Sequence, residues 1–192
     1  MTASDYQNLV KLCQALDEHG VEYLVFGSFA GRLQGADLET VDVDLVPERS
    51  EGNLGRLCDA LNSLRPRWRV EDSGPGVRID GGRLEARHIL GSSVALGVVT
   101  EAGLIDIVLE PRGYERGYND LILSAVTVPV GGSTVLVGSL SDLIRSKELL
   151  GREKDRTHLP SLLERQAEIE RLELIRGKYN SRGDDLGPGL SR

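Results

Sequence analysis

Apolar positions along the first half of the chain change their spacing several times, and each change predicts a new element. At the start they recur every three to four residues, which indicates an amphipathic helix with Ser4 or Asp5 as its cap. Glu51 to Leu64 repeats this spacing. Between the two helices, the continuous apolar run 23–26 and the alternating run 41–46 predict strands with a short helix between them.

The second half predicts two β-hairpins. The first joins residues 94–100 to 104–109, two apolar segments rich in β-branched residues, across a short loop that contains glycine. The second joins residues 126–130 to 134–137 across Gly131-Gly132. The segment between the hairpins, 113–124, is a poor helix candidate because it contains glycine and two tyrosines.

Two further helices are predicted after the second hairpin. Ser139 or Ser141 caps the first of them, and residues 162–175 form the second, which is strongly amphipathic. The last segment, 177–192, has four glycines, a proline and no apolar periodicity, so we expect a disordered tail.

Together these elements predict an α+β (α/β) fold, a mixed twisted sheet flanked by helices with a C-terminal helical extension. Residues 1–138 would form the core, and residues 139–176 would form the helical part of the same domain.

The composition is that of an ordinary soluble globular protein, with 40% hydrophobic and 28% charged residues. No apolar run approaches the length of a membrane span and the N-terminus is polar, so we expect a cytoplasmic protein with no membrane partner. The net charge of −7 argues against broad non-specific binding to nucleic acid. Cys13 and Cys58 lie in helical patterns and are expected to be small core residues.

Basic residues surround the single tryptophan in the segment 65–69. A nucleic-acid base could stack on Trp68 there. The simpler interpretation is that Trp68 packs at the edge of the core while the arginines stay solvated, and that His88 is structural.

Asp42 and Asp44 lie on the same face of the predicted strand 41–46, because side chains in a strand alternate between faces. Two neighbouring carboxylates on a mostly apolar strand repel each other unless something neutralises them, and a divalent cation such as Mg²⁺ suits an all-oxygen pair. The alternative is a strand edge on which both acids face water.

Gly27 and Ser28 end the preceding strand. Small residues at this point let backbone N–H groups and a hydroxyl approach phosphate oxygens closely. Lys147 lies on the otherwise apolar face of its predicted helix, where its ammonium could contact a triphosphate; the alternative is a lysine that extends to the surface at the helix border. These residues predict a site for a metal and a nucleoside triphosphate.

Asp106 is a lone acid between Ile105 and Ile107. Burying it without a partner would be costly, so we expect it to be the third carboxylate of the metal site. The alternative is an edge strand with Asp106 in water.

The spacing of an apolar-Gly-Ser sequence, thirteen residues, and then Asp-apolar-Asp-apolar resembles the signature of the DNA polymerase β-like nucleotidyltransferase superfamily. Lys147 followed by Arg152-Glu153-Lys154-Asp155 resembles the helical part of small prokaryotic nucleotidyltransferases, including the AbiEii-like and mycobacterial nucleotidyltransferase toxins of toxin–antitoxin systems. The resemblance covers residues 22 to about 163 and implies the minimal nucleotidyltransferase fold.

The resemblance also implies roles for individual residues. The metal, Mg²⁺ or Mn²⁺, would be bound by Asp42, Asp44 and Asp106; these acids, Lys147 and Asp155 would be catalytic; and the nucleotide would contact Gly27, Ser28, Lys147 and Lys154. Many relatives carry a second Asp where this chain has His158. Without the resemblance, Lys154 and Asp155 could form a surface ion pair.

The activity implied is transfer of a nucleoside monophosphate from an NTP to an acceptor hydroxyl with release of pyrophosphate. For the toxin branch the acceptor would be the 3′ end of tRNA, so that aminoacylation is blocked, and a cognate antitoxin would be the partner. Thr40 matches the position at which an antitoxin can phosphorylate a serine, and a phosphate there would repel NTP and compete for metal.

Two other functions fit the same residues. One is a nucleotidyltransferase for small molecules of the aminoglycoside type. The other is a binding protein, such as a minimal nucleotidyltransferase that serves as an antitoxin.

Overall fold

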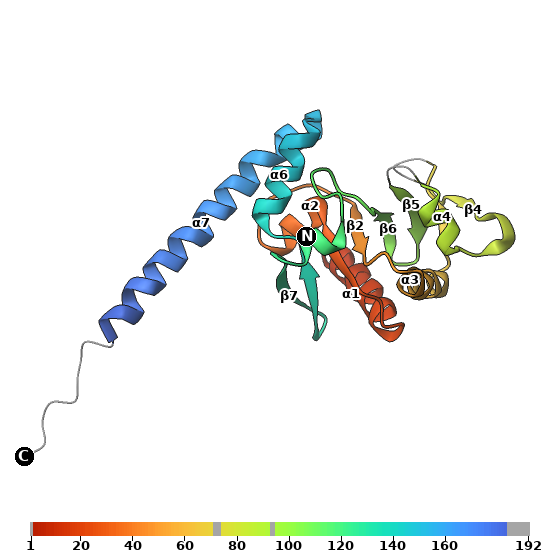
Figure 1. Cartoon of the computed structure of the whole chain (residues 1–192), viewed down its shortest axis with the longest axis horizontal. Coiled ribbons are helices and arrows are strands. Elements are labelled where there is room, and N and C mark those ends of the chain that lie inside the picture. The colour runs from red at the N-terminus through yellow and green to blue at the C-terminus, as the bar shows by residue number, and fades with distance from the viewer. Residues whose placement is uncertain (1, 71–73, 93–94, 184–192) are drawn as a thin grey trace, which may run out of the picture.

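The computed structural model describes residues 2–70, 74–92 and 95–183, in which eight strands form one mixed sheet with helices packed against it (Figure 1). The elements follow in the order α1 (Ala3–Glu18), β1 (Tyr23–Phe26), α2 (Gly27–Leu33), β2 (Asp42–Pro47), α3 (Glu51–Ser63), β3 (Arg67–Trp68), β4 (Val77–Arg78), the 3₁₀ turn η1 (Asp80–Gly82), α4 (Ala86–Leu90), β5 (Leu96–Thr100), β6 (Gly103–Ile107), α5 (Tyr118–Leu121), β7 (Val126–Val130), β8 (Ser133–Val137), α6 (Leu140–Leu150) and α7 (Glu153–Gly183). The predicted mixed α/β fold is confirmed.

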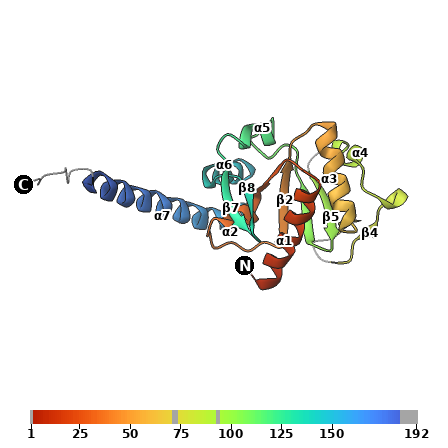
Figure 2. The ribbon, with the colours of Figure 1, turned by 90° about the horizontal axis from the view of Figure 1, so that it is seen from below.

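The strands lie in the order β4-β3-β5-β6-β2-β1-β8-β7. Strand β1 is antiparallel to β2 and parallel to β8, and β2 is parallel to β6. Every residue of β1 is buried, as expected for a strand covered on both faces. Figure 2 shows α1 and α3 side by side over one face of the sheet.

Both predicted hairpins are present. Strand β5 pairs with β6 and β7 pairs with β8, each across a two-residue loop. The strand predicted to reach residue 109 ends at Ile107, and the predicted start at Val94 lies outside the described residues. In segment 113–124 only α5 is helical, and Gly117, with a φ of 52°, immediately precedes it.

The N-cap of α1 lies two residues before the first of the two predicted caps. Thr2 is the N-cap: its hydroxyl accepts a hydrogen bond from the backbone N–H of Asp5, and the Asp5 carboxylate accepts one from the backbone N–H of Thr2. The prediction of Ser4 or Asp5 as the cap is therefore wrong, because Asp5 is the third residue of a reciprocal capping box. At α6 the cap is Ser139, one of the two predicted serines.

Helix α7 is longer than predicted at both ends. It begins at Glu153 and continues through Pro160. Just after this proline, Leu162 is fully buried against the core. It extends away from the sheet to Gly183 (Figure 1), so it reaches into the segment predicted to be a tail, of which residues 184–192 lie outside the described residues. Within the described part of the chain, no helix combines the length and apolarity needed to cross a bilayer.

Cys13 and Cys58 are buried and unbonded to each other, as predicted. Trp68 packs partly buried against the core, with its ring edge-to-face to His88 at 5.3 Å. Both side chains therefore have the structural placement that the sequence suggested.

Helix α7 is attached to the body through Leu162, which packs closely on α2. A Cβ atom added at Gly31 would lie 2.8 Å from Leu162 Cδ2, so the two helices are in close contact. We expect Leu162→Ala to lower the free energy of unfolding by roughly 2–4 kcal/mol, measured by urea denaturation, because truncation leaves a cavity. Its neighbour Leu163 is 49% exposed, and Leu163→Ala should cost less than about 0.5 kcal/mol. Equal losses in the two variants would contradict this packing.

Candidate active site

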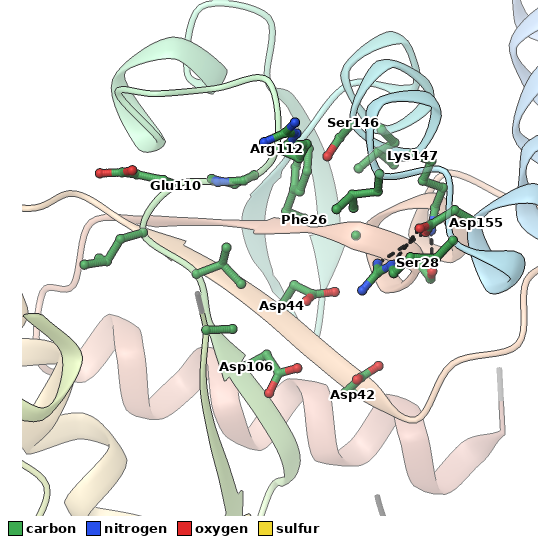
Figure 3. A pocket seen from close by; sticks show the side chains of 18 of the residues that line it. Phe26, Ser28, Asp42, Asp44, Asp106, Glu110, Arg112, Ser146, Lys147 and Asp155 are labelled. Carbon is green, nitrogen blue, oxygen red and sulfur yellow. Dashed lines mark hydrogen bonds and ion pairs between the residues drawn. The ribbon is translucent and has the colours of Figure 1, made fainter. Parts of the chain in front are cut away.

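A cleft of about 550 Å³ opens beside the central strands of the sheet. Side chains from β1, β2 and β6 line one wall, and α6 with the start of α7 lines the other. Figure 3 shows Asp42, Asp44 and Asp106 on the strand side, and Ser28, Lys147 and Asp155 grouped across from them.

The two acids of β2 face the cleft together, while Val43 between them is buried on the opposite face. Asp106 of β6 is the register partner of Asp44 in the parallel pair, which places it beside the other two acids. Because β2 lies between β1 and β6, and β6 between β2 and β5, neither strand is an edge. The alternatives that placed these acids on wet strand edges are therefore wrong.

The other two acids act strongly on Asp44. Burial, and next the negative charges of Asp42 and Asp106, raise the pKa of its carboxyl to about 7; the charges of Lys147 and Lys154 offset only part of this effect. Ionised Asp44 is therefore costly to the fold unless a cation reaches it.

Gly27 makes room for this carboxylate. Its φ is +63°, and a Cβ atom at this position would lie 1.9 Å from Asp44 Oδ2. Only glycine fits here, because any side chain would collide with the acid and would also adopt a left-handed conformation.

Asp42 has a different environment. Burial opposes its ionisation, yet a hydrogen bond from Thr40, and the charges of Lys154 and Arg69, outweigh burial and lower its pKa. The Thr40 hydroxyl donates to Asp42 Oδ1 at 2.6 Å. Asp42 is therefore ionised at a lower pH than Asp44.

Arg69 is the site residue that sequence reasoning missed. Its Nη2 lies 2.7 Å from a carboxylate oxygen of Asp106, and its Nη1 lies 3.5 Å from Asp42 Oδ2. The expectation that the arginines around Trp68 are all solvated is wrong for Arg69, which follows Trp68 and so points to the other side of the strand. One indication of this contact was present in the sequence: a buried acid between Ile105 and Ile107 needs a positively charged or hydrogen-bonding partner.

Ser28 and Lys147 meet on the other wall. Both are buried, and Lys147 Nζ donates to Ser28 Oγ at 3.1 Å. His158 Nδ1 lies 3.0 Å from the same hydroxyl. Burial, followed by the charges of Lys147 and Lys154, lowers the pKa of His158, so its ring is neutral at pH 7.

Asp155 holds Lys147 in place rather than joining the three acids. Its carboxylate lies 3.2 Å from Lys147 Nζ and 2.7 Å from Arg152 Nε, and it is fully buried. Burial opposes ionisation of Asp155, but the hydrogen bond from Arg152 and the charge of Lys147 together lower its pKa. A surface ion pair between Lys154 and Asp155 is therefore excluded.

Lys147 is not a lysine that extends to the surface, because its side chain is buried to the nitrogen. Burial lowers its pKa, although the charges of Asp155 and Asp44 favour the protonated form. Lys154 also lines the cleft. The cationic nitrogens thus lie across from the three carboxylates.

The donor set suits a hard divalent cation, because three carboxylates on adjacent strands face one cavity and their mutual repulsion raises the pKa of Asp44. In the described residues, no three acidic, His or Cys side chains are already drawn together as a metal cluster. Two of the three acids, Asp42 and Asp106, form ion pairs with Arg69.

The electrostatics of Asp44 predict a pH-dependent effect on stability. The folded-state pKa lies above the unfolded value of about 3.9, so ionisation destabilises the fold progressively as the pH rises from about 4 to about 7. In metal-free protein, the stability of Asp44→Asn relative to wild type should rise by on the order of 2 kcal/mol between about pH 5.5 and about pH 8, measured by urea denaturation with a chelator present. The exposed Asp59→Asn is the control; a difference for Asp44→Asn that does not vary with pH would contradict the assignment.

Comparison with known proteins identifies relatives of the fold. None of the protein-family models or curated proteins compared with the chain matches it. Among solved structures, the antibiotic-resistance factor ANT(2″)-Ia is similar with a TM-score of 0.56 and 16% identity, over 97% of this chain and 96% of that one.

Two other structures give similar values. A provisionally assigned nucleotidyltransferase from Thermotoga maritima has a TM-score of 0.54 and 17% identity, over 94% of this chain and 96% of that one. The lincosamide antibiotic adenylyltransferase LnuA, with lincomycin bound, has a TM-score of 0.51 and 11% identity, over 84% of this chain and 96% of that one. The chain therefore has the fold of the nucleotidyltransferases.

Proposed function

We propose that this protein is a metal-dependent nucleotidyltransferase. It would move a nucleoside monophosphate from an NTP to an acceptor hydroxyl and release pyrophosphate. The proposal rests on one observation, the two sides of the cleft. Three carboxylates on adjacent central strands lie on one side, and the buried, hydrogen-bonded Ser28 and Lys147 lie on the other.

Asp42, Asp44 and Asp106 are the residues that would hold Mg²⁺ or Mn²⁺. When bound, the metal supplies neutralisation of charge on the α-phosphate and lowers the pKa of the attacking hydroxyl. The acceptor oxygen forms a bond to the α-phosphorus, and the bond from that phosphorus to the oxygen bridging to the β-phosphate breaks. A carboxylate of the strand wall accepts the hydroxyl proton.

Ser28, Lys147 and Lys154 would bind the β- and γ-phosphate oxygens. Asp155 and Arg152 keep Lys147 aimed at Ser28, and the neutral His158 can hydrogen-bond to Ser28 without adding charge. Gly27 leaves Asp44 space beside the phosphates.

A small molecule is the acceptor that the cleft favours. Of the described residues that line the cleft, equal numbers are cationic and acidic: Arg49, Arg112, Lys147, Arg152 and Lys154 against Asp42, Asp44, Asp106, Glu110 and Asp155. Such a balanced lining, in a chain of net charge −7, gives little attraction for a polyanion. One of the similar structures is an antibiotic-resistance factor and another is a lincosamide antibiotic adenylyltransferase with lincomycin bound, which supports an acceptor of that size.

The 3′ end of tRNA is the second candidate acceptor. It is supported by the likeness of residues 147–155 to the toxin branch and by the position of Thr40, whose hydroxyl contacts Asp42. In that function a cognate antitoxin would control the enzyme.

One transfer assay tests the activity and separates the acceptors. Purified protein with each α-³²P NTP and Mg²⁺ is offered total tRNA, an aminoglycoside or a lincosamide in parallel. We expect label in a small acceptor, and a loss of roughly 100-fold or more in Asp42→Ala and Asp106→Asn, because each removes a metal ligand. Asp59→Asn, which changes an exposed acid in the same way, should stay near wild type. Label in tRNA alone would establish the toxin function, and no transfer or NTP binding at all would contradict the proposal.

Thr40 provides a test of regulation at the site. Thr40→Glu places a negative charge beside Asp42, and it should reduce transfer by roughly 100-fold or more through repulsion of the triphosphate. Thr40→Val removes only the hydrogen bond and should stay within about tenfold of wild type. Full activity of Thr40→Glu would show that a phosphate at this position cannot control the enzyme.

A further inference from the structure

Arg69 is placed beside the acids by the sheet itself. It directly follows β3, and its backbone N–H donates to the carbonyl of Gly97 on β5 at 3.1 Å. Gly97 is in turn the register partner of Asp106. The guanidinium therefore arrives at Asp106 through two pairs of hydrogen-bonded strands and not through a loose surface loop.

Gly97 leaves the space that this arrangement needs. A Cβ atom on Gly97 would lie 2.9 Å from Arg69 Nε and 3.1 Å from Asp106 Oδ1. A larger residue here would push the guanidinium and the carboxylate apart. Gly97 is not part of a turn, and its φ does not require glycine, so close approach of the two side chains explains the residue.

The guanidinium bridges acids on two different strands. It lies 2.7 Å from Asp106 on β6 and 3.5 Å from Asp42 on β2, and only 19% of the Arg69 side chain is exposed. The two carboxylates are also two of the three oxygen donors available to a divalent cation. A dication among these oxygens would lie within a few ångströms of the guanidinium and repel it.

We propose that Arg69 is a built-in competitor of the catalytic metal: it neutralises Asp42 and Asp106 in the metal-free protein and must release them when a divalent cation binds. This inference rests on the proposed function, because it takes these acids as the metal ligands. Arg69 stabilises the metal-free site and at the same time weakens metal binding.

The test is a Mn²⁺ titration of nucleotide-free protein, followed by electron paramagnetic resonance or calorimetry. Arg69→Met should bind Mn²⁺ about tenfold or more tightly than wild type, within the usual range for coupled sites. Arg67→Met, an exposed cation on the same strand, is the matched control and should bind as wild type does.

A second readout covers the stability of the variants. Without metal, Arg69→Met should melt at a lower temperature than wild type, and saturating Mn²⁺ should raise its melting temperature by more than it raises that of wild type. This larger rise in melting temperature distinguishes competition from a simple loss of folding, because an unfolded Arg69→Met variant would not be stabilised by Mn²⁺.

The Mn²⁺ titration separates competition by Arg69 from the existence of the metal site. Unchanged or weaker Mn²⁺ binding in Arg69→Met, with saturable binding in wild type that Asp106→Asn abolishes, would overturn the competition while leaving the metal site standing. Absence of saturable binding in both wild type and Arg69→Met would overturn the metal site of the proposed function as well. Binding only in Arg69→Met would support the competition most strongly.

Discussion

Repulsion among three carboxylates is the constraint on which the site depends. Asp42, Asp44 and Asp106 lie on neighbouring interior strands, whose parallel pairing keeps the backbones that carry them close together. The cost is visible in Asp44, whose pKa is raised to about 7 by burial and by its two neighbours. A sheet that keeps such a cluster needs positive charge beside it.

The rest of the cleft supplies that charge from several directions. Arg69 reaches Asp42 and Asp106 from the strand side, while Lys147 and Lys154 reduce the pKa of Asp44 from the helix side. Buried Asp155 prevents Lys147 from turning away. Two glycines, Gly27 and Gly97, provide the space in which these charged groups approach one another. Fixed cations thus lie across the cleft from the acids, and we propose that they bind a triphosphate while a metal takes the place of Arg69 at the acids.

The central strands and the three acids could be predicted from the sequence because their signals are local. Alternation along residues 41–46 places Asp42 and Asp44 on one face, and the apolar flanks of Asp106 indicate burial. Arg69 could not be predicted in this way, because its contact depends on the register of β3 on β5 and of β5 on β6. The residues next to Arg69 in the sequence do not indicate how β3, β5 and β6 pair.

The helix boundaries were predicted wrongly because they too depend on contacts that the local pattern does not show. Residues 153–161 look like a connection, since they contain Pro160 and several charges, yet tertiary packing of Leu162 and the Asp155 network makes them helical. The Thr2 cap was missed because Asp5, which was predicted as the cap itself, is instead the third helical residue that pairs with a cap two residues before Ser4.

The most direct test of the account is to locate the metal in the cleft. Crystals of the protein with Mn²⁺ and a non-hydrolysable NTP analogue would show, by anomalous diffraction, where the metal binds. We expect a peak coordinated by Asp42, Asp44 and Asp106, with the triphosphate extending to Ser28 and Lys147 and with Arg69 withdrawn from Asp42 and Asp106. A peak elsewhere, or a bound nucleotide with no metal at these acids, would contradict it.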